Sequence, residues 1–338
     1  MPNGGGRIDV HCHSMTPAYR AAISSLGPTI RTPAWTTQAA IDFLDRHGTA
    51  AAVLSLSVPG THHGDDAKAR QLARRCNEEA AEFVDRHPKR LGAFATLPIP
   101  DVEGACEEAR HALDVLKLDG IGLLASYNGK YLGAAEFDPI FELMNERSAV
   151  VLIHPNNHPS TQLVRQGISK GIGNFIVEFL FDTTRAALNL LFSDALDRFP
   201  NIRFILCHAG GTLPYVTWRL AEIVSRQMTV PPWDAQYPSP FMQRHSGRVT
   251  ADLVRGQLKR FWYETALAAG PETFGSLKAV ANPDRILFGS DWPYCPDDMT
   301  EDMIDALGDA TMLDRKQRAA IERGNALHLF PRFGGGAL

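Results

Sequence analysis

The chain has 338 residues, of which 44% are hydrophobic and 21% are charged, a composition typical of a globular protein with a sizeable core. A formal charge of -4 and an isoelectric point near 6.3 give no electrostatic reason to expect nucleic acid or an anionic membrane as a partner. The five cysteines are odd in number and form no C-x-x-C pair, which argues against a disulfide framework and a cysteine-rich zinc module. We therefore expect a small-molecule substrate and a reducing compartment.

The N-terminal residues 1–6 are polar and glycine-rich, without the charged start and apolar core of a secretory signal. No apolar run approaches the length of a membrane span. These two observations predict a cytoplasmic protein with no membrane partner.

Short apolar runs recur along the chain and predict eight strands, over residues 7–13, 51–57, 91–97, 120–126, 149–155, 203–208, 261–265 and 285–291. Helical spacing predicts helices over residues 35–46, 65–87, 101–116, 137–146, 176–199, 212–228 and 314–323. Near-continuous apolar strands are typical of a parallel sheet covered by helices. The pattern predicts an α/β fold, a single (β/α)8 TIM barrel over residues 1–338. An open doubly wound sheet is the alternative, but no G-x-G-x-x-G follows the first strand.

Three long segments interrupt this alternation, at about residues 14–35, 156–176 and 228–248. We expect them to be irregular loops that cap the mouth of the barrel, because connections of this length often cover a site. The third contains Pro231, Pro232 and Trp233, a composition that suits a lid or a subunit contact.

The first strand carries His11 and His13, which should point to one side while Val10 and Cys12 point to the other. By the same alternation, we expect Cys207 to lie among the helices. Two imidazoles on one side of a strand end can hold one cation.

Three further strands end in His154, His208 and Asp291. The C-terminal ends of barrel strands converge on one mouth, where active sites lie. Four imidazoles and a carboxylate there can form a coordination shell for zinc, manganese or iron, with one group left for acid-base chemistry. The alternative is structural: the H-x-H pair as core histidines, His154 as a strand cap, His208 as support for a glycine turn, and Asp291 as a helix cap.

The segments D-V-H-C-H at 9–13, I-H-P at 153–155, C-H-A-G-G at 207–211 and G-S-D-W-P at 289–293 resemble the amidohydrolase superfamily. More narrowly, they resemble the branch that contains aminocarboxymuconate-semialdehyde decarboxylase and the ortho-hydroxybenzoate decarboxylases. The resemblance covers nearly the whole chain and implies a barrel of the metal-dependent hydrolase type.

The resemblance implies that His11, His13, His154 and Asp291 bind one divalent metal, Zn²⁺ with Mn²⁺ as the alternative, and that His208 is the acid-base residue. Asp291 is the other candidate for delivering the proton. Relatives with two metals place a carbamylated lysine on the fourth strand, whereas residues 120–126 contain no lysine and Lys130 lies beyond them.

Arg219 matches an arginine that, in relatives of this branch, reaches the substrate carboxylate in the neighbouring subunit. This implies at least a homodimer. The alternative is an ordinary solvated arginine on a helix.

The resulting expectation is non-oxidative decarboxylation of a small aromatic acid, an ortho-hydroxybenzoate of the methylsalicylate or resorcylate type or an aminocarboxymuconate-semialdehyde-like acid. A single-metal hydrolase, either a lactonase or an amidohydrolase, would use the same residues. A metal-stabilised binding protein is disfavoured, because a closed structural site needs no extra histidine.

Overall fold

The computed structural model describes residues 6–27, 32–167, 172–226, 239–245, 248–309 and 311–334. Its main sheet has eight strands whose neighbours pair in parallel, in the order β1, β2, β3, β4, β7, β8, β9, β10. They are β1 (Arg7–His13), β2 (Thr49–Ser55), β3 (Leu91–Ala95), β4 (Gly120–Leu124), β7 (Val150–His154), β8 (Arg203–Leu206), β9 (Trp262–Glu264) and β10 (Ile286–Leu287). The eight strands of the predicted barrel are confirmed.

The segment that follows β10 completes the ring against β1. The backbone N–H of Val10 donates to the carbonyl of Phe288 at 3.0 Å, and that of His13 donates to the carbonyl of Trp292 at 2.7 Å. A parallel bridge also joins Cys12 to Trp292. The sheet is therefore a nearly closed barrel, in which the segment after β10 lies against β1.

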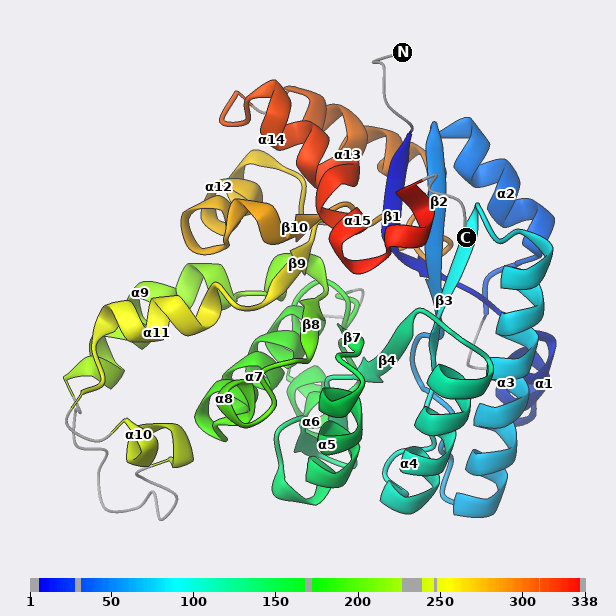
Figure 1. Ribbon diagram of the computed structural model, residues 1–338, viewed down its shortest axis with the longest axis horizontal. Helices are drawn as coiled ribbons and strands as arrows, with labels where there is room; N and C mark the ends of the chain where they lie inside the picture. Colours follow the sequence, from blue (N-terminus) through cyan, green and yellow to red (C-terminus); the bar gives the residue numbers. More distant parts are fainter. Residues whose placement is uncertain are drawn as a thin grey trace.

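Helices surround the strands in Figure 1. They are α1 (Pro17–Ser25), α2 (Thr37–Arg46), α3 (Asp66–Arg86), α4 (Val102–Arg110), α5 (Asp138–Glu146), α6 (Pro159–Gln166), α7 (Glu178–Phe192), α8 (Ala195–Arg198), α9 (Leu213–Ser225), α10 (Pro240–Arg244), α11 (Ala251–Leu258), α12 (Pro271–Val280), α13 (Asp297–Asp309), α14 (Arg315–Ala319) and α15 (Asn325–Leu329). A hairpin of β5 (Ser126–Tyr127) and β6 (Lys130–Tyr131) follows β4. In the described part of the chain, no helix has the length and apolar character needed to cross a membrane.

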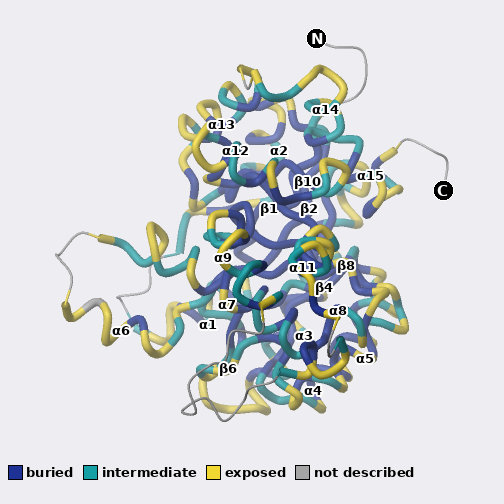
Figure 2. The backbone as a smooth tube through the Cα atoms, turned by 90° about the vertical axis from the view of Figure 1, so that its left-hand side faces the viewer, coloured by how far each residue is buried: buried dark blue, intermediate teal, exposed yellow. Residues whose placement is uncertain are grey.

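Two apolar layers hold the barrel together, and both are buried (Figure 2). The larger one lies between strands and helices. The smaller one fills the interior with side chains such as Ile8, Val53 and Leu152, and Phe330 after α15 packs there against Phe94, with ring centroids 5.9 Å apart. Because the interior is filled, we expect a site at the end of the barrel where the strands terminate.

Two segments expected to be irregular contain helices. Thr16 caps α1, and its hydroxyl accepts from the backbone N–H of Tyr19 at 3.2 Å. His158 caps α6 in the same way, and in both helices a proline occupies the first turn. A capping side chain followed by proline is a helix-start signal, so the prediction of loops at 14–35 and 156–176 was wrong in this respect. Most of 228–248 lies outside the described residues, including Pro231, Pro232 and Trp233.

The helix predicted over 176–199 is divided into α7 and α8. Asp194 between them has a positive φ of 63°, a left-handed conformation that a continuous α-helix does not accommodate. The helices α11, α12 and α13 were not predicted, and they occupy the stretches on either side of β9 and after β10.

The first strand departs from simple alternation, whereas β8 follows it up to Cys207. Pairing of β1 with β2 is irregular between Asp9 and Cys12, so Val10 packs in the interior while Cys12 packs towards the helices. Cys207 packs in the barrel interior, on the same face as Ile205, so its predicted place among the helices was wrong. The prediction counted back from His208 as an inward strand residue, but the backbone has left the strand conformation there, with φ of 54°. All five cysteines are free and buried.

Candidate active site

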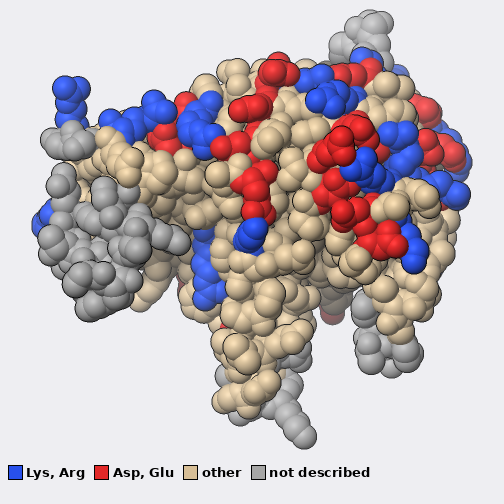
Figure 3. All heavy atoms as spheres, turned by 90° about the horizontal axis from the view of Figure 1, so that it is seen from below, with Lys and Arg blue, Asp and Glu red and all other residues tan. Residues whose placement is uncertain are grey.

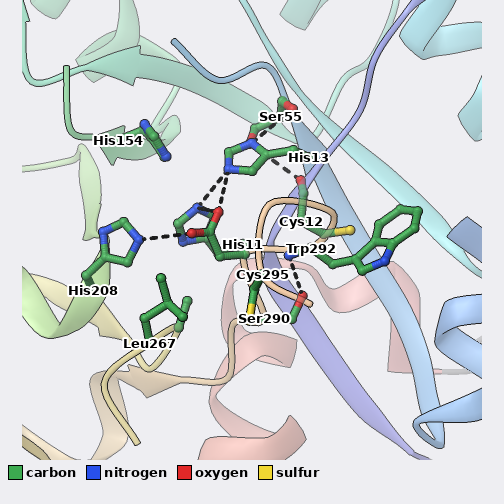
Figure 4. A network of polar contacts seen from close by, with 12 residues as sticks. His11, Cys12, His13, Ser55, His154, His208, Leu267, Ser290, Trp292 and Cys295 are labelled. Carbon is green, nitrogen blue, oxygen red and sulfur yellow. Dashed lines mark hydrogen bonds and ion pairs between the residues drawn. The ribbon is translucent and has the colours of Figure 1, made fainter. Parts of the chain in front are cut away.

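Four of the predicted site residues meet at the C-terminal end of the barrel. His11 and His13 come from β1, His154 ends β7, and Asp291 follows β10. All four are buried, and one potential ligand atom of each lies within 4.8 Å of those of the others. Figure 4 shows the three imidazoles around a common space, with His208 beside them.

The atoms facing this space are very close together. Nε2 of His11 lies 3.0 Å from Nε2 of His13, and Oδ1 of Asp291 lies 3.3 Å from the first and 3.0 Å from the second. The ring of His154 is at right angles to that of His11, with centroids 5.3 Å apart. Four ligands around a zinc ion at about 2.0–2.1 Å would have their donor atoms roughly 3.3 Å apart. The spacing fits a single cation.

The outer nitrogens of the three histidines fix which nitrogen faces the centre. Nδ1 of His11 lies 3.0 Å from a carboxylate oxygen of Glu264, Nδ1 of His13 lies 3.4 Å from the carbonyl oxygen of Ser55, and Nδ1 of His154 lies 2.8 Å from that of Pro155. A carbonyl oxygen can only accept, so Nδ1 carries the proton in His154. Nδ1 of His13 has both oxygens of Ser55 as neighbours, the hydroxyl at 3.0 Å being the nearer, and it carries the proton when it donates to either. Nε2 is then left with a lone pair, as metal coordination requires.

The pKa directions of His13, His154 and Asp291 agree with this assignment. Burial alone would lower the pKa of His11, but the neighbouring Cys207, Glu264 and Asp291 raise it well above its usual value. Burial lowers the pKa of His13, and burial together with the neighbouring His13 and His11 lowers the pKa of His154 well below its usual value. Burial alone would raise the pKa of Asp291, but contact with His11, His13 and His208 holds that pKa well below its ordinary value. Two neutral imidazoles and an ionised carboxylate therefore face the centre. These are the forms in which such groups bind a divalent metal.

Asp9 ties the first strand to the segment that carries Asp291. Its carboxylate accepts from the backbone N–H of His11 at 3.0 Å and from the N–H and hydroxyl of Ser290 at 3.1 and 2.5 Å. Burial raises the pKa of Asp9 to about 7, although the Ser290 hydroxyl opposes this. The backbone N–H of Asp291 also donates to the carbonyl of His11 at 2.7 Å. These bonds fix the relative positions of His11 and Asp291.

His208 stands at the edge of the group rather than within it. Its Nε2 lies 3.4 Å from Oδ2 of Asp291, and its ring centroid lies 5.1 Å from that of His11. Its Nδ1 is buried and has no hydrogen-bond partner among the described residues. The left-handed run from His208 to Gly211 makes a sharp turn, and at Gly211 a Cβ would lie 2.1 Å from the carbonyl oxygen of Leu180.

Two other residues considered in the sequence lie away from this group. Lys130 in β6 pairs with Glu136, and no lysine lies on β4. Arg219 is an exposed residue of α9 and, among the described residues, has no hydrogen bond or ion pair. The structure thus brings together five of the six predicted site residues and leaves Arg219 outside.

Sequence reasoning missed Glu264, the last residue of β9, which is fully buried beside His11. An acidic residue at the end of a strand otherwise made of aromatic residues was the available signal. It also missed Tyr294, whose ring packs edge-on against His13 at 5.3 Å between centroids.

The comparison with protein families agrees with this geometry. The model of the amidohydrolase family matches residues 8–332. The chain belongs to the amidohydrolase family. Active sites of (β/α)8 barrels lie at the mouth, and the four buried ligand candidates meet there.

Relatives of this amidohydrolase include named decarboxylases. It is 34% identical over 336 residues to the 6-methylsalicylic acid decarboxylase of Penicillium expansum, and the alignment covers 97% of each chain. It resembles a solved dihydroxybenzoic acid decarboxylase from Polaromonas with bound manganese and the inhibitor 2-nitroresorcinol, with a TM-score of 0.79, 26% identity and 97% of each chain covered. A 2,6-dihydroxybenzoate decarboxylase complexed with 2,6-dihydroxybenzoate matches with a TM-score of 0.76 and 25% identity over 97% of this chain and 100% of that one.

Proposed function

We propose that this protein is a metal-dependent, non-oxidative decarboxylase of an ortho-hydroxybenzoate, with a methylsalicylate-like acid as the first choice. The observation that carries the proposal is the convergence of three imidazole Nε2 atoms and the Asp291 carboxylate beside His208. The 34% identity to a 6-methylsalicylic acid decarboxylase over nearly the full chain supports this choice of substrate.

In this proposal His11, His13, His154 and Asp291 hold one divalent metal. Zn²⁺ suits a site of three imidazoles and a carboxylate, and Mn²⁺, which the Polaromonas relative binds, is the alternative. When bound, such an ion supplies a Lewis acid that can hold the carboxylate and the neighbouring hydroxyl of the substrate.

Loss of carbon dioxide requires a proton at the ring carbon that carries the carboxylate. Once that carbon is protonated, the bond to the carboxylate breaks, its electron pair restores the aromatic ring, and carbon dioxide leaves. We assign the proton transfer to Nε2 of His208, because the low pKa of Asp291 keeps that carboxylate ionised at neutral pH. Asp291 then orients His208 and stabilises its charged form.

The walls of the mouth suit an aromatic ring. Leu267 lies beside His208 in Figure 4 and is 37% exposed, and Tyr294 near His13 is 40% exposed. The ring of Phe179 lies 6.2 Å from that of His154. We propose that the described parts of the segments 14–35 and 156–176 border this mouth, within one domain that spans the chain.

The proposal includes a homodimer or larger assembly. Tyr215 and Trp218 on α9 are 85% and 71% exposed, and Leu163 on α6 is 71% exposed. The arm with α6 projects from the body in Figure 2, and the view from below shows a protrusion on which few of the described side chains are charged (Figure 3). Exposed apolar groups of this kind mark interaction surfaces, and Arg219, which follows Trp218 on α9, would then reach the partner's site.

Metal analysis followed by incubation with a panel of acids tests the proposal. The panel contains 6-methylsalicylate, 2,6-dihydroxybenzoate, an aminomuconate acid and simple lactones. We expect stoichiometric metal and release of carbon dioxide from an ortho-hydroxybenzoate. Ring opening of a lactone with no carbon dioxide from any acid would replace the decarboxylase with a hydrolase, and metal that raises the melting temperature without turnover would indicate a binding protein.

A further inference from the structure

Glu264 makes an unusual set of contacts for a fully buried carboxylate. One oxygen lies 3.0 Å from Nδ1 of His11 and also accepts from the backbone N–H of His208. The other oxygen accepts from the backbone N–H of Ala266 at 2.6 Å. No lysine or arginine of the described residues pairs with it. Its contacts therefore go to the candidate ligand His11, to the turn at His208 and to the segment after β9.

The two contacts of Oε1 connect His11, a proposed metal ligand, with His208, the proposed proton donor. The bond to His11 places the proton on Nδ1 and turns the Nε2 lone pair towards the centre, and an anionic partner makes the imidazole a stronger ligand. The bond to His208 holds a residue whose backbone is left-handed, with φ of 54°, a conformation that persists only where the surroundings enforce it.

The glycine at position 289 is independent evidence that the side chains of Glu264 and His11 lie close together in this place. A Cβ at position 289 would lie 2.1 Å from Oε2 of Glu264 and 2.9 Å from Cβ of His11. Gly289 has an ordinary backbone conformation, since it is not among the residues with positive φ. Glycine is therefore required here by the closeness of the carboxylate and the imidazole rather than by the turn.

A second metal is the competing explanation, because His11, Cys207 and Glu264 also offer ligand atoms within 4.8 Å of one another. A cation there would have to displace the backbone donors of His208 and Ala266 from the carboxylate. It would also compete for Nδ1 of His11, which already faces Glu264. The hydrogen bonds therefore favour a positioning role over coordination.

We propose that Glu264 is a positioning residue that sets both the metal affinity of His11 and the place of His208 in proton transfer. The part that concerns turnover rests on the proposed decarboxylase function. The part that concerns metal affinity does not, because it can be measured whatever the reaction is.

The test compares Glu264→Gln with Glu108→Gln in the full chain. Glu108 is the matched control, since it is also a buried glutamate but pairs with Arg74 and Asn77 on the helices. Zn²⁺ and Mn²⁺ affinity is measured by competition with a chromophoric chelator, and kcat and KM are measured at saturating metal. We expect Glu264→Gln to weaken metal binding by roughly 10- to 100-fold and to lower kcat with little change in KM, while Glu108→Gln changes neither.

Unchanged metal affinity in a folded Glu264→Gln would overturn the proposal. If that variant does not fold, Glu264→Asp and Gly289→Ala are measured in the same way. The first keeps the charge but shortens the reach, and the second presses a methyl group against the carboxylate. Weaker metal binding in both supports the proposal, and wild-type affinity in both overturns it. Absence of decarboxylation by the wild-type, metal-loaded protein would instead contradict the proposed function.

Discussion

The carboxylate of Asp291 lies between two imidazoles, with Oδ1 3.0 Å from Nε2 of His13 and Oδ2 3.4 Å from Nε2 of His208. One oxygen thus belongs to the group that holds a cation, and the other faces the proposed proton donor. Because the two oxygens have separate partners, metal binding and proton transfer can be separated by mutation.

Replacing His208 should abolish turnover and leave metal binding intact. His208→Ala removes the acid-base group without removing any of the four candidate ligands. We expect kcat to fall by about 10²- to 10⁴-fold, with wild-type metal content by atomic emission. A near-normal rate would show that another group delivers the proton.

Replacing His13 should remove metal and activity together. Its Nε2 lies 3.0 Å from both His11 and Asp291, so His13→Ala takes away a ligand from the middle of the group. Metal content and kcat are expected to fall in parallel. His328→Ala, on α15 at the opposite end of the barrel, is the control and should retain both. Full metal occupancy in His13→Ala would exclude His13 as a ligand.

Removal of the metal should lower the melting temperature. Without a cation, the buried carboxylate of Asp291 and three imidazoles share one small space. A ligand that binds only the folded state stabilises it by about 2.7 kcal/mol when present at a hundred times its Kd. We expect chelator-treated protein to melt at a lower temperature and Zn²⁺ or Mn²⁺ to restore the original value, as measured by calorimetry. An identical transition in both states would argue against a bound cation.

The sequence predicted the strands and the residues at the strand ends because each is a local property. A buried parallel strand needs an apolar run, and a side chain at its C-terminal end must face the mouth. His154 shows this directly, since its position in the sequence, at the end of β7, determines its place in the site.

The contacts that orient the site could not be predicted in this way. Glu264 and His11 are 253 positions apart, and their contact depends on how the barrel closes and on the small size of Gly289. His208 reaches the site although its neighbour Cys207 is also in the interior, because the backbone turns at His208, where φ is 54°. Such features follow from packing between distant segments, which periodicity in the sequence does not describe.

Substitutions on α9 should separate assembly from substrate binding. Trp218→Glu places a charge on the exposed apolar face, and we expect it to convert the assembly to monomers in sedimentation experiments. Arg219→Ala should keep the assembly but raise KM by about 10- to 100-fold, the value of a charge-assisted contact with a carboxylate. Arg226→Ala is the control, because Arg226 is bound to Glu222 on the same helix. A wild-type monomer with full activity would contradict the role of Arg219 in a partner's site.

The buried carboxylate of Asp182 should give the protein a measurable dependence of stability on pH. Asp182 accepts from the backbone N–H of Asn156 at 2.7 Å, and burial raises its pKa above the ordinary value of 3.8. A carboxyl group with a raised pKa in the folded state contributes stability below its ordinary pKa, and that contribution is lost as the pH rises through the folded-state pKa. Asp182→Asn stays neutral and can still accept from Asn156. The melting temperature of this variant minus that of the wild type should therefore increase from pH 4 to neutrality. The exposed control Asp252→Asn should show a constant difference from the wild type, and parallel curves for Asp182→Asn and wild type would contradict the raised pKa.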